Sequence, residues 1–265
     1  METSSGMAAA VVVEGYLKAI ANHTEPRPSY FITVSNEGST IATSFSPPLT
    51  FLPGCNYEMA LCSLETYYSF PNIDKTNNAL KVSRDNGKKW TLIEIPTGCY
   101  EIKAINKTLQ RLIKRKITDA KEDDVKLAPN ENTLQCILTL KDNIQVDFNI
   151  ENSLRSVLGF EARVYTRGRH ESEHIVNILR VNSIFVHCDV VKSSRKNGIE
   201  SPLIDTFFPN VSPGEKIVHR PKNLIYLQLT LDIISKMTVW LMDQNDTPLD
   251  LRGEELTITF HIKAC

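Results

Sequence analysis

Apolar and polar side chains alternate along most of the chain with the two-residue period of a β-strand. The run at 254–263 is the clearest, because Leu256, Ile258, Phe260 and Ile262 fall on one face and polar side chains on the other. Runs of this kind, bounded by turn residues, predict further strands at 29–35, 40–45, 55–70, 88–95, 134–140, 144–150, 174–191, 215–219, 223–231 and 235–242. The pattern therefore indicates an all-β, antiparallel sandwich.

Short turns and one change of phase predict how some strands are connected. Asn-Glu-Gly at 36–38 separates the first two strands, and Lys-Asp-Asn at 141–143 separates two strands of the middle third. Each pair is therefore expected to form a hairpin. In the run 55–70 the alternation slips by one residue at Ser63, which predicts a β-bulge or a bend between sheets.

One segment has a helical period instead. Apolar residues recur there at steps of three and four, which predicts a single amphipathic helix over 100–117 with one buried stripe: Ile102, Ile105, Leu109, Leu112 and Ile113. A shorter helical turn is expected at 152–160, with Asn152 or Ser153 as its N-cap and Gly159 as its C-terminal stop.

The polar face of the predicted helix is strongly basic, with Lys107, Arg111, Lys114, Arg115 and Lys116. Two interpretations fit this pattern. The side chains can form a solvated face whose cations favour the C-terminal end of the helix dipole. Alternatively, they can form a contact surface for nucleic acid or for an acidic partner.

The distribution of these elements predicts the domain organisation. Residues 1–28 form a flexible N-terminal arm, because they are small and polar at first and end in Thr-Glu-Pro-Arg-Pro, whose prolines prevent regular pairing. Residues 29–265 form one β domain, and an inserted lobe is expected around 100–131, where the helix and a charged loop interrupt the strands.

Composition narrows the class of protein. The chain has 265 residues with 30 basic and 31 acidic side chains, so it lacks the basic excess of a dedicated nucleic-acid binder. Its six cysteines form no C-x-x-C pair, which favours free thiols in a reduced intracellular setting. No stretch approaches the roughly 20 apolar residues of a membrane helix, so no membrane contact is expected.

One stretch raises the question of catalysis. His-Glu-Ser-Glu-His at 170–174 matches H-E-x-x-H, in which two histidines on one helix face bind zinc and the glutamate acts as a base. The residues that follow are rich in β-branched side chains and predict a strand, on which His170 and His174 would stand about 13 Å apart. Since other catalytic motifs are also missing, we expect no enzyme activity, no metal and no cofactor.

Seven blocks carry a family resemblance, and the most specific is D-Q-x-x-x-x-L-D-L-R-G-E-E at 243–255. From about residue 30 to the C-terminus the chain resembles minor capsid (penton-like) proteins of Maverick/Polinton elements, a class of transposable element, and of adinto-like viruses of animals. The blocks are 56–73, 93–106, 152–160, 181–190, 205–217, 221–229 and 239–263.

The resemblance implies a jelly-roll viral protein that forms homopentamers at the fivefold vertices of an icosahedral virion or virus-like particle. It implies self-association and a separate major capsid protein as partner, with assembly inside the host cell. Candidate oligomer contacts are aromatic residues in expected loops, for which ordinary core packing is the alternative: Tyr67, Tyr68, Phe70, Phe207 and Phe208. The competing function is a β-sandwich recognition module of the cytokine or lectin type.

Overall fold

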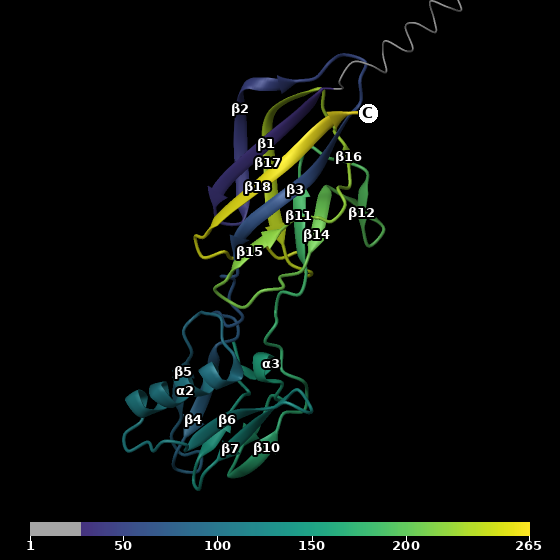
Figure 1. Ribbon diagram of the computed structural model, residues 1–265. Coiled ribbons are helices and arrows are strands. Elements are labelled where there is room, and N and C mark those ends of the chain that lie inside the picture. The colour runs from purple at the N-terminus through teal and green to yellow at the C-terminus, as the bar shows by residue number, and fades with distance from the viewer. Residues whose placement is uncertain (1–27) are drawn as a thin grey trace, which may run out of the picture.

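The computed structural model describes residues 28–265, so the predicted N-terminal arm lies outside the described residues except for Pro28. Two separate hydrophobic cores divide the chain into the two lobes of Figure 1. One core draws on residues 32–70 and 181–264, and the other draws on residues 73–165. We call the first lobe the sandwich. The second is called the inserted lobe, because its segment interrupts the sandwich.

Two antiparallel sheets build the sandwich. The first sheet has the order β1-β18-β3-β15, with β16 also pairing with β3, and the second has the order β14-β11-β17-β2. The first-sheet strands are β1 (Ser29–Glu37), β18 (Glu255–Ala264), β3 (Tyr57–Tyr67), β15 (Lys216–His219) and β16 (Leu227–Gln228). The second-sheet strands are β14 (Leu203–Phe207), β11 (Ile184–Cys188), β17 (Ile233–Met242) and β2 (Thr40–Thr50). A small hairpin of β12 (Ser194–Lys196) and β13 (Ile199–Ser201) stands beside β14.

The order of these strands identifies the architecture. Numbered along the chain without β12, β13 and β16, the eight strands lie in the orders 1-8-3-6 and 5-4-7-2. The chain therefore wraps antiparallel strand pairs around two packed sheets, which is the arrangement of a jelly roll. The predicted all-β jelly-roll sandwich is confirmed by this topology.

Alternation of side chains explains the first sheet. The apolar face of β18 is fully buried, as its pattern predicts, while hydroxyl pairs such as Thr33 and Thr259 (3.1 Å) lie on its outer face. The phase slip near Ser63 is also confirmed as a bulge. Ser63 pairs with Thr259 but Leu61 pairs with Phe260, so β3 has one extra residue at that point.

Both predicted hairpins are wrong. β1 pairs with β18 and β2 pairs with β17, so the first turn carries the chain from one sheet to the other. In the middle third, β7 pairs with β6 and β10, whereas the next strand, β8, pairs with β4 and β9. In a sandwich, neighbouring runs can bury their apolar faces against each other across the core instead of within one sheet.

Two further sheets and a helix build the inserted lobe. One sheet contains β5 (Thr91–Glu94), β4 (Ala79–Ser83), β8 (Gln145–Asp147) and β9 (Val164–Tyr165). The other contains β10 (Gly168–Glu171), β7 (Gln135–Leu140) and β6 (Val125–Asn130). Residues 100–131, where the sequence pointed to an insertion, form part of this longer segment.

The main helix of the lobe, α2 (Ile102–Lys116), buries the five apolar residues that its period predicted. It contacts β6 and β5 through this stripe. The short helix α3 (Arg155–Leu158) ends at Gly159, whose positive φ of 82° provides the expected left-handed stop. A side chain at Gly159 would lie 2.2 Å from the backbone oxygen of His174, so glycine is required there for space as well.

Two chain crossings join the lobes, one after β3 and one before β11. The Asn72 side chain donates to the backbone oxygens of Tyr100 (2.7 Å) and Ile178 (3.0 Å), and its own oxygen accepts from the Tyr100 amide. The predicted strand at 174–191 is correct only over β11. Residues 172–183 form the extended return crossing, which no sheet of the described chain includes.

Candidate assembly surfaces

Three of the five aromatic candidates belong to the sandwich core. Tyr68 and Phe70 are buried and stack at 4.2 Å, and buried Phe207 stacks on His219 at 4.3 Å. Tyr68 and Phe70 follow the end of β3, and Phe207 is the last residue of β14. All three rings nevertheless turn inward, so the expectation that they are exposed and contribute little to the monomer is wrong. Only Tyr67 (40% exposed) and Phe208 (71% exposed) present their rings to the surface.

The five basic candidates are exposed on α2. Lys116 alone continues the line of the buried stripe, beyond Leu112 and Ile113. Lys107, Arg111 and Lys114 share one face of the helix, since they follow each other at steps of four and three residues. Lys116 Nζ donates to the backbone oxygen of Leu92 (3.0 Å), which places the basic end of the helix beside β5. No ion pair of the described residues engages these five side chains.

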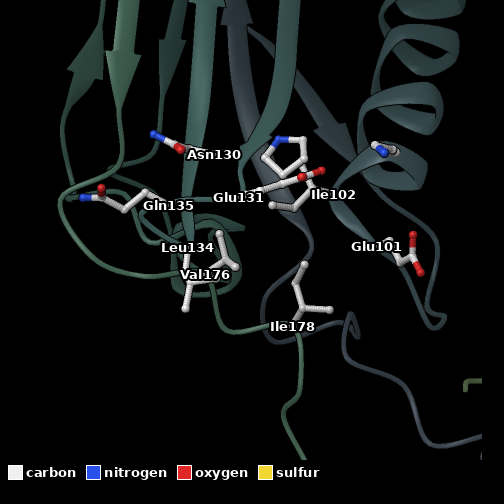
Figure 2. Close-up of a pocket in the computed structure, with 10 residues that line it drawn as sticks. Glu101, Ile102, Asn130, Glu131, Leu134, Gln135, Val176 and Ile178 are labelled. Carbon is white, nitrogen blue, oxygen red and sulfur yellow. The ribbon is translucent and has the colours of Figure 1, made fainter. Parts of the chain in front are cut away.

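A groove lies at the other end of α2 and has a volume of about 320 Å³. Its apolar lining comes from three segments: Ile102 at the helix start, Leu134 in the β6–β7 turn, and Val176 and Ile178 in the return crossing. Figure 2 shows these side chains around the groove, with Glu131 next to Ile102 and Glu101 farther out at its edge. The Val176 amide donates to the Leu134 oxygen (2.9 Å), so the return crossing is fixed against the turn.

In the β6–β7 turn, Leu134 has an unusual backbone conformation and an exposed side chain. Leu134 has a positive φ of 58°, which costs a branched residue free energy, and its side chain is 61% exposed beside the groove. Ile175 (64%) and Leu179 (70%) are also exposed on the adjoining return crossing. This apolar surface was not foreseen, because the residues at 174–191 were predicted to form a strand. The sequence shows a run of β-branched residues there, but it does not show that no other strand pairs with this run.

The H-E-x-x-H residues do not form a zinc site in this fold. His170 lies on strand β10 with its Nε2 2.6 Å from the Thr166 oxygen, whereas His174 lies beyond the strand with its Nε2 2.8 Å from Glu161 Oε1. Hydrogen bonds from Thr133 and Asn130 lower the pKa of Glu171, which makes it a poorer base. Among residues 28–265 no cluster of histidine, cysteine or carboxylate groups has the spacing to hold a metal ion.

Buried polar groups in the sandwich are few. His187 on β11 stacks on Trp240 (5.3 Å) and is 4% exposed, and its burial, with Lys196 nearby, lowers its pKa. The thiols of Cys136 and Cys188 are buried in the two cores, where desolvation raises the pKa of each to about 12. These cysteines therefore pack as small apolar side chains.

No described helix is both long and apolar enough to cross a lipid bilayer.

Comparison with known proteins returned similar structures only. No family model matches the chain, and no curated protein sequence matches it. The crystal structure of the mavirus penton protein is similar with a TM-score of 0.48 and 10% identity, covering 90% of this chain and 100% of that one. The 3.5 Å cryo-electron microscopy structure of the Sputnik virophage contains a chain that is similar with a TM-score of 0.43 and 13% identity, covering 90% and 98%.

Proposed function

We propose that this chain is a minor capsid protein of the penton type, which occupies the fivefold vertices of an icosahedral virus particle as a homopentamer. The observation that carries the proposal is the strand order of the sandwich, 1-8-3-6 and 5-4-7-2, which is that of a jelly roll. The family resemblance of the sequence blocks supports the same function. These blocks supply strands of both sheets, including β3, β11, β17 and β18.

A vertex protein works through shape and stiffness. Each sheet of the sandwich buries its inner face in one continuous core, and both ends of the described chain lie together, since the Ala264 amide donates to the Pro28 oxygen (3.1 Å). This end of the sandwich is the one farthest from the inserted lobe (Figure 1). The inserted lobe is therefore free to reach neighbours or solvent at the opposite end.

A closed ring needs two different surfaces on each copy, because every contact in it is heterologous. Each contact would bury about 800 Å² per partner, with a few anchoring side chains at its centre. Tyr67 and Phe208 are the proposed sandwich contacts, since they are large and exposed without contributing to the monomer core. The other proposed partner is the major capsid protein of the same element, which this chain would contact in the assembled particle.

Mass measurement of the purified full chain by native mass spectrometry tests the proposal. We expect a pentamer, and we expect particles with density at the fivefold vertices when the chain is expressed with its major capsid protein. Phe208→Asp should weaken the pentamer, whereas Ile199→Asp, at an equally exposed position of the β12–β13 hairpin (74%), should not. A chain that stays monomeric and is absent from purified particles overturns the proposal.

A further inference from the structure

The two ends of α2 carry opposite chemistry that the fold of one copy does not use. At its first residue the helix borders the apolar groove, whose rim carries Glu101 and Glu131. At its last turn it carries Lys114, Arg115 and Lys116. A helix of 15 residues is about 22 Å long, so the two ends are too far apart to neutralise each other within one copy.

The groove end is acidic and apolar. Glu101 and Glu131 are exposed, and no ion pair of the described residues engages either carboxylate; Lys103 is the one basic side chain in the lining. Glu101 is also the residue before the helix, but its side chain does not cap the helix amides. The lining below the carboxylates is formed by Ile102, Leu134, Val176 and Ile178.

The opposite end is basic and carries its own apolar group. Lys114 and Arg115 are exposed without an ion pair in the part of the chain that the structure describes. Leu92 on β5 lies beside Lys116 of the same helical turn, because its backbone oxygen accepts from the Lys116 ammonium group. Its side chain is 42% exposed. Glu122 and Asp123 follow in the next loop, but the last helical turn itself contains three cations and no anion.

We infer that the groove at the start of α2 binds the basic end of α2 from a second copy of this chain. Lys114 and Arg115 of one copy face Glu101 and Glu131 of the next, and Leu92 packs against the groove. Such a contact joins unlike surfaces, as a closed ring requires. Figure 1 shows α2 running across the inserted lobe, transverse to the line that joins the lobes, which suits a contact between copies standing side by side. The inference rests on the proposed pentamer and names a contact within it.

Charge reversal at the two ends tests this pairing. Lys114→Glu with Arg115→Glu makes both ends acidic, and Glu101→Lys with Glu131→Lys makes both ends basic. Each double variant places like charges in every contact, and we expect association about a hundredfold weaker, measured by native mass spectrometry and sedimentation at low salt. All four positions are exposed, so circular dichroism should show the fold of the unchanged protein. Each double variant sets charges against the dipole of α2, so we expect only a slightly lower melting temperature.

The variant that combines all four substitutions is the decisive one. It reverses both ends, restores opposite charges at every contact, and should form pentamers again. An equimolar mixture of the two double variants can pair only in alternation, and an odd ring cannot alternate, so it should give even-numbered or open assemblies. Lys222→Glu with Lys236→Glu changes the net charge by the same amount as Lys114→Glu with Arg115→Glu, but at exposed sites of the sandwich, and should leave the pentamer intact.

The outcomes separate the contact from the function. If the unchanged protein forms pentamers and both double variants do so equally well, this contact is refuted while the penton assignment stands. Weakening by the double variants without recovery in the combined variant also refutes the pairing, because the two ends then act independently. A protein that is monomeric at every concentration, with or without its major capsid protein, removes both proposals.

Discussion

Asn72 is the best place to test how the inserted lobe is held to the sandwich. Its side chain is buried and makes three hydrogen bonds, two to backbone oxygens of Tyr100 and Ile178 and one from the Tyr100 amide. Asn72→Ala removes all three and leaves their part-buried backbone partners without this side chain. At about 1 kcal/mol for each hydrogen bond, the substitution should cost about 3 kcal/mol of stability.

Urea unfolding followed by circular dichroism measures this loss, and hydrogen exchange locates it. The Tyr100 amide should exchange faster in the variant by roughly the factor that 3 kcal/mol implies, about 150-fold, because Asn72 Oδ1 is its acceptor. Amides in the centre of β18 should change less than this amide if the loss is local to the crossing.

Asn72→Asp is the matched variant, since it preserves the size and the acceptor but removes both donors. An ionised carboxylate would then face the oxygens of Tyr100 and Ile178, so we expect this variant to be at least as unstable as the alanine variant. The reasoning is refuted if Asn72→Ala changes stability by less than 0.5 kcal/mol (about a third of the smallest total expected from three bonds) or if Asn72→Asp is as stable as the unchanged protein.

Three further predictions concern the cores. Leu109→Ala should cost about 2–5 kcal/mol in urea unfolding, because Leu109 is fully buried on the inner face of α2; a cost below 1 kcal/mol would contradict that packing. Cys136 and Cys188 should resist thiol reagents at pH 8 in the folded protein while exposed Cys55 reacts, as mass mapping would reveal, because burial raises their pKa to about 12. Burial lowers the pKa of His187, so as the pH falls below its unfolded pKa of about 6.5 the unfolded chain binds more protons than the folded chain, and the free energy of unfolding decreases. His187→Gln should make this decrease between pH 7 and pH 5 smaller. An unchanged slope would count against the burial of His187.

The groove could not be foreseen because its walls come from three separated segments. The helix start, the β6–β7 turn and the return crossing are brought together only when residues 73–178 enclose their own core. The opposite charges at the two ends of α2, in contrast, could be predicted in part from the sequence. The spacing of the basic residues in the sequence identified the basic end. Glu101 and Glu131 could not be identified as neighbours, because only the fold brings the start of α2 and the β6–β7 turn to the same groove.

The sequence by itself determined those features that depend on residues close together in the chain. The alternation in β18, the buried stripe of α2, the bulge near Ser63 and the glycine stop of α3 each depend on side chains a few residues apart, and each is present in the structure. Only the tertiary structure decided which strands pair, which aromatic rings face inward and how far the inserted lobe extends. The physical reason is that an apolar face is stabilised by whichever distant segment covers it, and the same pattern of residues fits a partner in its own sheet, across the core or on another copy.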